Sequence, residues 1–352
     1  MFPRIMISLP KLISNAQTIL SLCKRHGVSS IFLVGKVLAG YKEVLGALAP
    51  LGFTYLADSR MDNLKKFQEF SIPKALTRIP MLSEIKDVIK YSSLALVSEI
   101  KTIEALSQEA FRQEKNYDVI LMFDLGDLRE GVFYKEDYMP LIKAILHLPN
   151  IHLKGIGTNL TCLEGVIPDQ VNMGILVDIK NKIENAFEIH LDLVSGGNSS
   201  TLYMLDNLPS QINNLRIGEA IFLGRETAFG NLIPGMFQDA FTLEAEIVEI
   251  QRKPSHPIGT LSINAFGETP ILRNSGEMNR AILAIGKQDV DHNHLTPHDS
   301  TIKSLESNSD YLIIQLEDNT YHLGDIVSFS LDYASLLQCM SSHYVRKILL
   351  NS

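Results

Sequence analysis

The sequence predicts an α/β protein in which a (β/α)8 barrel of the TIM type, residues 1–232, precedes a C-terminal all-β domain, residues 233–352. Up to about residue 222, eight short apolar segments alternate with helical segments, and this alternation favours parallel strands that close into a barrel. From about Pro234 the apolar segments are short and β-branched, with Pro, Gly, Asn and Asp between them, as in a β domain. An open doubly wound sheet is the alternative, but no Gly-rich dinucleotide turn follows the first barrel strand.

The individual elements follow from apolar spacing and from residues that begin or end helices. A short strand near the N-terminus is available to pair with the β domain, and Pro10 then opens an amphipathic helix that Gly27 closes. Runs of apolar residues predict the barrel strands, which begin at Ile31 and continue at residues 54–57, 75–79, 94–97, 119–124, 153–158, 190–194 and 215–222. Helices are predicted at residues 41–51, 61–70, 83–90, 101–113, 139–146 and 170–186, with a short one after Asn198. In the β domain we expect strands at residues 241–249, 260–265, 281–285, 311–316 and 326–331.

Composition and charge narrow the class of protein. A content of 45% hydrophobic and 20% charged residues is typical of a globular protein and argues against disorder. Charged and amide side chains interrupt the apolar stretches of Met1–Leu20, so we expect neither a signal peptide nor a membrane span, and a cytoplasmic location. Three widely separated cysteines suit a reducing compartment and show no metal-type pairing. A net charge of -8 argues against a nucleic-acid partner and is compatible with a cationic substrate.

A single lysine, Lys36, stands at the end of the first barrel strand. One interpretation is that it marks the point where the strand reaches solvent, because lysine is almost never buried without a partner. The other is a Schiff-base lysine, since an amine in partly apolar surroundings loses its proton readily and becomes a nucleophile.

The loops after the later strands carry polar residues that suit a phosphate. Active sites of such barrels lie at the carboxyl ends of the strands, and phosphate sites commonly follow the last two. Here Ser195, Gly197, Asn198 and Ser199 follow the seventh strand, where glycine allows close approach of the backbone and free amides suit an anion. The same run is also compatible with an ordinary turn. A phosphate site facing a Schiff-base lysine describes a pyridoxal-phosphate site, so we expect this cofactor and no metal.

The last barrel strand carries Arg216, either as a surface ion pair or as a group that points into the barrel mouth. Arginine only donates hydrogen bonds. If Arg216 meets the pyridine nitrogen of the cofactor, that nitrogen stays unprotonated and the ring is a weaker electron sink, which favours simple α-proton exchange.

Several stretches resemble fold-type III pyridoxal-phosphate enzymes of the alanine racemase group, and most closely its ornithine racemase-like branch. The similar stretches cover nearly the whole chain: Lys36 after the first strand, and residues 58–60, 124–131, 158–162, 165–168, 195–200, 216–228 and 285–291. The resemblance implies a barrel followed by a β domain, a homodimer with shared active sites, and a small amino-acid substrate.

The resemblance also implies roles for individual residues. Lys36 would bind the cofactor and act as base on one face of the substrate, with Asn159 near the cofactor ring and Arg216 on the pyridine nitrogen. Ser199, with the amides of Gly218 and Glu219, would bind the phosphate. Arg129 would lie near the phenolic oxygen or the substrate carboxylate. Related decarboxylases carry Glu where Arg216 stands, which favours a racemase.

Two departures from the alanine racemase pattern concern the second base and a modified lysine. The turn that supplies a tyrosine from the partner subunit in alanine racemases corresponds best to residues 263–267, which contain no hydroxyl. The position that often carries a carbamylated lysine is Met122. Alanine specificity is therefore not expected.

The β domain offers replacements for the missing tyrosine. Asp291 and Tyr333 are candidates for the second catalytic group, and Asp289 or Asp291 is a candidate for binding the distal ammonium of a diamino acid, by analogy with the related decarboxylases. The neighbouring His292, His294 and His298 are interpreted as solvated turn residues and not as metal ligands.

The sequence thus predicts a pyridoxal-phosphate-dependent amino-acid racemase that acts on ornithine or another diamino acid. A decarboxylase on the same scaffold and a non-catalytic cofactor-binding protein are the alternatives, and a cofactor-free Schiff-base aldolase is disfavoured by the phosphate site and Arg216.

Overall fold

The computed structural model describes residues 1–264, 266–267, 269, 276–317 and 320–351, which divide into two compact units. One unit, the barrel unit, is Lys11–Gln238, and the other, the β unit, combines Met1–Pro10 with Asp239–Ser352. The chain stays with the barrel unit beyond residue 232 because Asn15 binds the backbone of Phe237. Its Nδ2 donates to Phe237 O at 2.8 Å and its Oδ1 accepts from Phe237 N at 2.7 Å.

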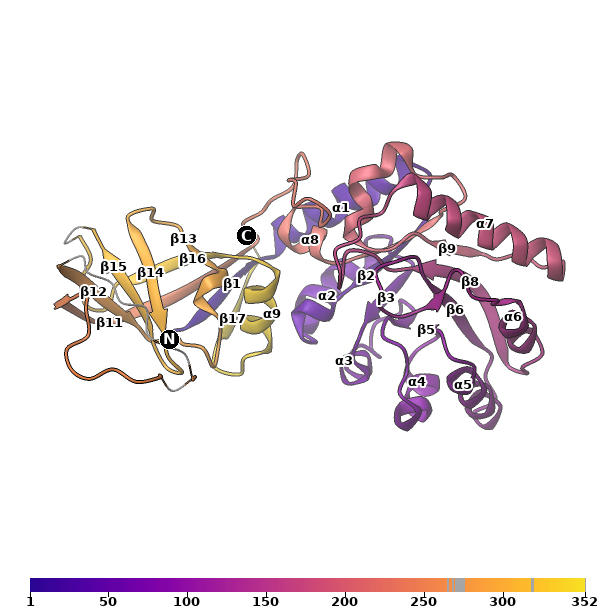
Figure 1. Cartoon of the computed structure of the whole chain (residues 1–352), viewed down its shortest axis with the longest axis horizontal. Helices are drawn as coiled ribbons and strands as arrows, with labels where there is room; N and C mark the ends of the chain where they lie inside the picture. The colour runs from indigo at the N-terminus through magenta and orange to yellow at the C-terminus, as the bar shows by residue number, and fades with distance from the viewer. Residues whose placement is uncertain (265, 268, 270–275, 318–319, 352) are drawn as a thin grey trace. The chain divides into compact units, whose positions relative to one another are not determined.

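Eight parallel strands close into a barrel within the barrel unit, as the sequence predicts (Figure 1). They are β2 (Ser30–Val34), β3 (Tyr55–Asp58), β4 (Lys74–Leu76), β5 (Leu94–Val97), β6 (Tyr117–Asp124), β8 (Ile151–Thr158), β9 (Leu193–Ser195) and β10 (Asn214–Ile217). The spatial order is β5-β4-β3-β2-β10-β9-β8-β6, and β5 pairs with β6 to complete the ring. The short β7 (Val132–Phe133) adds to β6 outside this ring.

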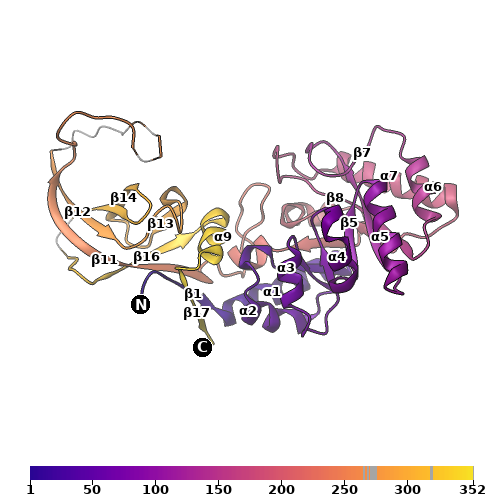
Figure 2. The same ribbon diagram turned by 90° about the horizontal axis from the view of Figure 1, so that it is seen from below.

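Helices connect the strands and surround the barrel, as the two views in Figure 1 and Figure 2 show. The α-helices are α1 (Leu9–Arg25), α2 (Lys42–Leu48), α3 (Met61–Lys66), α4 (Ile85–Tyr91), α5 (Ile100–Arg112), α6 (Met139–Leu146), α7 (Gln170–Phe187) and α8 (Glu219–Leu223). Short 3-10 helices are η1 (Lys36–Leu38), η2 (Ala49–Leu51), η3 (Leu82–Glu84) and η4 (Ser199–Asn207). Within the described residues, no helix combines the length and the apolar character that a membrane span requires.

The last barrel strand is shorter than the sequence predicts. A strand was expected over residues 215–222, but β10 ends at Ile217 and α8 begins at Glu219. Gly218 O accepts from Ile221 N at 3.0 Å, so the chain turns into a helix directly after the strand. The apolar residues after this point are buried on a helix, and their run cannot be distinguished from a strand by hydrophobicity alone.

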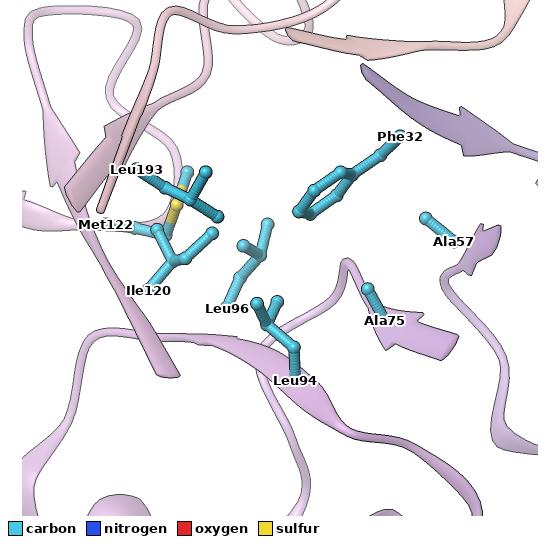
Figure 3. Close-up of a cluster of buried hydrophobic side chains, with 8 residues drawn as sticks. All are labelled: Phe32, Ala57, Ala75, Leu94, Leu96, Ile120, Met122 and Leu193. Atoms are coloured by element: carbon cyan, nitrogen blue, oxygen red, sulfur yellow. The ribbon is translucent and has the colours of Figure 1, made fainter. Parts of the chain in front are cut away.

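The interior of the barrel is filled by apolar side chains, which Figure 3 shows converging from neighbouring strands. The buried cluster consists of Phe32, Ala57, Ala75, Leu94, Leu96, Ile120, Met122 and Leu193. Large and small side chains share the layer, so that the volume is filled without a pore. The polar groups of the candidate site therefore come from the carboxyl ends of the strands and the loops that follow them.

The β unit is built around an antiparallel sheet. Its elements are β1 (Arg4–Ser8), β11 (Phe241–Pro254), β12 (Glu277–Leu283), β13 (Leu295–Pro297), β14 (Ile302–Ser307), β15 (Leu312–Leu316), β16 (Ile326–Leu331), β17 (Arg346–Leu350), the helix α9 (Tyr333–Ser341) and the 3-10 helix η5 (His292–His294). The order is β13-β16-β11-β12-β15-β14. The N-terminal β1 pairs antiparallel with β11 and parallel with β17.

The strand predicted at residues 260–265 is wrong for the part that the structure describes. Residues 260–264 form no strand, and Ala265 lies outside the described residues. The pairing of β11 with β12 ends at Pro254 and Glu277, so residues 255–276 form the connection between the two strands. Pro257 and Gly259, just before the predicted strand, suit such a connection.

The barrel cluster provides a test of this packing. Leu96→Ala removes a side chain that is only 1% exposed, and we expect a loss of roughly 2–5 kcal/mol in the free energy of unfolding because a cavity remains. Leu82→Ala, at a position 62% exposed, is the matched control and should change the stability by less than about 0.5 kcal/mol. Chemical unfolding followed by circular dichroism measures both, and equal losses would contradict the assigned core.

Candidate active site

Lys36 lies at the carboxyl end of β2, beside the buried carboxylate of Asp58. Gly35 N donates to Ala57 O at 2.8 Å, which ties the end of β2 to β3, and η1 then begins at Lys36. The Lys36 side chain is exposed in the single chain, whereas Asp58 is fully buried. Burial raises the pKa of the Asp58 carboxyl to about 6, against hydrogen bonds from Arg60 N and Asn63 and the charge of Lys36, which lower it.

The Gly-Ser run after β9 is locked into one conformation by hydrogen bonds from both sides. Asn198 caps η4 by accepting from Ser200 N at 2.8 Å, and Thr201 Oγ1 donates to Gly196 O at 2.7 Å. Gly197 has a φ of +110°, a conformation that other residues rarely adopt. Ser199 Oγ accepts from Ala220 N at 3.2 Å, so this hydroxyl joins the start of η4 to the first turn of α8. The run and the Gly218-Glu219 turn therefore lie side by side.

Arg216 is buried in the mouth of the barrel and is held by groups from neighbouring strands. Its Nη2 donates to Thr158 O on β8 at 2.7 Å, and its Nη1 donates to Ser195 Oγ on β9. Ser195 in turn donates to Asn214 Oδ1, and Asn214 Nδ2 donates to Ser30 Oγ on β2 at 2.9 Å. Burial lowers the pKa of Arg216 to about 10, which leaves the guanidinium charged at neutral pH. The hydroxyl of Ser195, predicted to bind the cofactor, is thus engaged with Arg216 and Asn214.

Arg129 and Asn159 meet through one carboxylate. Arg129 Nε lies 2.8 Å from Glu130 Oε2, and Asn159 Nδ2 donates to Glu130 Oε1 at 3.4 Å. Asn159 Oδ1 accepts from Asn198 Nδ2 at 2.9 Å. The loops after β6, β8 and β9 are therefore connected through these side chains. The structure brings Arg129, Asn159 and Asn198 together.

A second carboxylate fixes the loop after β8. The buried Asp127 accepts from the backbone N–H groups of Cys162, Leu163 and Val166 at 3.0–3.1 Å. Cys162 is exposed, and its Sγ lies 3.4 Å from Asn198 Nδ2. The loop that carries Asn159 is therefore anchored before any ligand binds.

The donors at this mouth fit pyridoxal phosphate. The cofactor needs an amine for its aldehyde, donors for its phosphate and a group for its pyridine nitrogen, and Lys36, the Gly197–Ser200 run and Arg216 would supply these functions. The hydroxyls of Thr158 and Ser200 are buried and have no hydrogen-bond partner within the described part of the chain. Such a group costs about 1–3 kcal/mol, which a bound polar ligand would relieve.

The predicted residues of the C-terminal domain belong to the β unit. Asp289 is 5% exposed and accepts from Ser342 Oγ at 2.6 Å, so its carboxylate is used inside the unit. Asp291 caps η5, and the Asn293 N–H that donates to it at 3.0 Å lowers the pKa of its carboxyl. Tyr333 begins α9 and is half-buried.

The histidines beside Asp291 each have a side-chain partner of their own. His294 Nδ1 lies 2.6 Å from Asp332 Oδ2, His292 Nδ1 lies 2.9 Å from Ser307 Oγ, and His298 Nε2 lies 3.0 Å from Ser330 Oγ. Among the residues that the structure describes, no three His, Cys, Asp or Glu side chains are grouped so as to hold a metal ion.

The sequence analysis assigned no role to Thr158, Glu130 or Asn214, although residues 124–131 and 158–162 carry part of the resemblance. Asn214 precedes Arg216 by two positions, and alternation along a strand places both on one face, a signal that was available. Glu130 directly follows Arg129, but its bond to Asn159 depends on how two loops fold.

The raised pKa of Asp58 predicts a pH-dependent stability. Because the folded state holds this proton up to about pH 6 and the unfolded state only up to about pH 4, the burial of Asp58 costs stability as the pH rises between these values. We expect the free energy of unfolding of Asp58→Asn, relative to that of wild type, to rise by up to about 3 kcal/mol between pH 4 and pH 7. Asp62→Asn, at an exposed position, is the control, and parallel pH profiles of Asp58→Asn and wild type in chemical unfolding would contradict the effect.

The chain is similar to known racemases along its whole length. Residues 7–226 match the family model for the alanine racemase N-terminal domain. The ornithine racemase of Acetoanaerobium sticklandii is 44% identical over 354 residues, which cover 99% of this chain and 100% of that protein. The lysine racemase of Thermotoga maritima is 35% identical over 355 residues, with 99% and 98% covered.

Solved structures share the fold at low sequence identity. An alanine racemase of Clostridium difficile 630 matches with a TM-score of 0.76 and 17% identity over 100% of this chain and 96% of that one. An alanine racemase of Bacillus anthracis, with bound L-Ala-P, has a TM-score of 0.77 and 16% identity over 100% and 96%. The family match and the relatives together show that the chain belongs to the alanine racemase family.

Proposed function

We propose that this protein is a pyridoxal-phosphate-dependent racemase that interconverts L- and D-ornithine as a homodimer. The observation that carries the proposal is the position of Lys36, at the same strand ends as the Gly197–Ser200 run and Arg216. The 44% identity to an ornithine racemase over the whole chain supports ornithine as the substrate.

The barrel mouth offers a separate group for each part of the cofactor. Lys36 would hold it covalently through the ε-amino group, the Gly197–Ser200 run with the Gly218-Glu219 turn would bind the phosphate, and Asn159 would lie near the ring. When bound, pyridoxal phosphate withdraws electrons from the α-carbon of an amino acid and so makes the α-proton acidic. Because Lys36 stands at this mouth, its amine is the group proposed to take or return that proton on one face.

The fixed positive charge of Arg216 would limit how strongly the bound cofactor withdraws electrons. Its guanidinium is anchored by Thr158 O and Ser195 Oγ and can only donate a hydrogen bond to a pyridine nitrogen. It does not deliver a proton to that nitrogen at neutral pH, so electron withdrawal is limited. This limit favours exchange of the α-proton over decarboxylation.

The second proton-transfer group is proposed to come from the β unit of the other subunit. Asp291 and Tyr333 are the candidates, which would make the dimer necessary for catalysis. Between the two aspartates considered for the distal ammonium, Asp291 is favoured because Asp289 is buried and bonded to Ser342. The hydrogen bond from Asn293 lowers the pKa of the Asp291 carboxyl, which favours its charged form as a partner for an ammonium. Three free cysteines among the described residues support a cytoplasmic location.

The first experiment tests Lys36 itself. We expect purified wild-type protein to show a visible absorbance that borohydride bleaches, and to incorporate deuterium at the α-carbon of ornithine without releasing carbon dioxide. Lys36→Ala should lose both properties, with racemisation reduced by at least about three orders of magnitude, because the amine is proposed both to bind the cofactor and to transfer the α-proton. Lys42→Ala, which removes an exposed lysine paired with Glu69, should keep both.

Either of two results would refute this assignment. Release of carbon dioxide would identify a decarboxylase, and a coloured protein that exchanges no α-proton would identify a cofactor-binding protein without this activity.

A second experiment tests substrate selection by Asp291. If Asp291 binds the distal ammonium, Asp291→Ala should raise the KM for ornithine about 10- to 100-fold, because an ionic contact is lost, and should leave kcat for amino acids without that group unchanged. If Asp291 transfers the second proton, kcat should fall for both substrate types. Asp310→Ala, at an exposed position of the same unit, is the control. Steady-state polarimetry with both substrate types gives the answer, and an unchanged KM for ornithine would exclude Asp291 from the substrate site.

A further inference from the structure

The carboxylate of Glu130 lies between two side chains assigned to the site, and each of its oxygens has its own partner. Oε2 is 2.8 Å from Arg129 Nε, and Oε1 accepts from Asn159 Nδ2 at 3.4 Å. The Glu130 side chain is 16% exposed, so water screens these contacts only in part. A carboxylate with one oxygen on each partner fixes the separation of Arg129 and Asn159.

Glu130 is also the main charge that offsets the burial of Arg216. Burial lowers the pKa of the Arg216 guanidinium, the Glu130 carboxylate raises it, and the Arg129 guanidinium lowers it. Two positive groups thus face the same mouth with one carboxylate acting on both. Without the carboxylate, the repulsion between Arg129 and Arg216 would favour an Arg129 side chain turned toward solvent, where it is already 37% exposed.

The backbone holds Glu130 at this point. Gly131 has a φ of +133°, and a Cβ atom there would lie 2.5 Å from Asp124 N, so the chain returns onto β6 in a way that only glycine permits. Asp124 Oδ1 accepts from Gly126 N at 2.8 Å and from Leu128 N at 3.2 Å, which braces the preceding turn. Such a braced loop positions its carboxylate before any ligand binds.

Within β6, Met122 offers no charge to this corner, and the carboxylate of Asp124 at the end of the strand accepts from Gly126 N and Leu128 N. Met122, on β6, is fully buried in the apolar cluster of the barrel, as Figure 3 shows. The carboxylate that contacts Arg129 is that of Glu130, in the loop after β6.

We propose that Glu130 is a positioning residue that holds Arg129 and Asn159 in their working orientation. The inference rests on the proposed function, because it assigns Arg129 and Asn159 to the cofactor and substrate. Glu130 itself transfers no proton and acts through Arg129.

The first readout needs neither cofactor nor turnover. In the apoprotein, the rate at which phenylglyoxal modifies Arg129, followed by peptide mass spectrometry, reports whether its guanidinium is held. We expect Glu130→Gln to raise this rate several-fold, because the neutral amide keeps the shape and loses the charge. Glu136→Gln, which removes an exposed carboxylate from the same segment, should leave the rate unchanged.

The second readout is kinetic. Glu130→Gln should lower kcat for ornithine about 10- to 100-fold with a smaller change in KM, and Glu130→Asp, which keeps the charge on a shorter side chain, should lose less. The double variant Glu130→Gln/Arg129→Gln should be no slower than Arg129→Gln alone, because the carboxylate acts through that arginine. Thermal unfolding checks that each variant is folded. If Glu130→Gln does not fold, Glu130→Asp is compared with wild type in both readouts instead.

The possible outcomes separate this inference from the proposed function. The inference alone is overturned if wild type is active and Glu130→Gln has the same modification rate of Arg129, or the same kcat, as Glu136→Gln. Additive losses in the double variant also overturn it, since Glu130 would then act without Arg129. A wild type that neither takes up pyridoxal phosphate nor exchanges an α-proton overturns the proposed function and this inference with it.

Discussion

The buried guanidinium of Arg216 is the constraint on which the barrel mouth depends. A charge out of water is costly unless it is fully hydrogen-bonded, and the partners here come from β8 and β9, with Asn214 and Ser30 completing the network toward β2. Four adjacent strands must therefore end in register and deliver polar groups at one level. The apolar cluster of Figure 3 takes side chains from β2 and β9 among these strands and from β3, β4, β5 and β6 on the rest of the ring. The Arg216 guanidinium is thus satisfied at the carboxyl ends of the strands, which is where a ligand can reach it.

Most of the barrel could be predicted because its signal is repeated. Eight alternations of apolar run and amphipathic segment fix the order of the elements even where a boundary is misplaced. The error at residues 215–222 arose because a buried helix after a buried strand continues the same apolar composition. In the β unit the signal is weaker: residues 260–264 have strand-like composition but lie in the long connection between β11 and β12, and the pairing that decides this is remote in sequence. Helix α9 was missed although the strand before it was predicted at residues 326–331, so the cap formed by Asp332 and Ser335 was an available signal.

The site could be predicted strand by strand but not as a network. Lys36, Arg216 and the Gly-Ser run are each placed by the rule that barrel chemistry lies at strand ends. The hydrogen bonds that connect the loops do not follow from this rule. Glu130 contacts Asn159 of another loop, and Asp127 accepts from the backbone after Leu160. Such contacts depend on loop conformation, which spacing does not encode. The two aspartates of the β unit show the same limit: only burial distinguishes Asp289 from Asp291.

The pairing of β1 with both β11 and β17 has a consequence for synthesis. During translation the barrel residues leave the ribosome well before residues 346–350 exist, and domains commonly fold as they emerge. Strand β1 is made before β11 and β17, so its two edges are covered only after both of these strands have been synthesised. An unpaired strand edge invites association with other chains. A nascent chain stalled after Gln238 would therefore carry β1 with both of its edges uncovered beside the residues of the barrel.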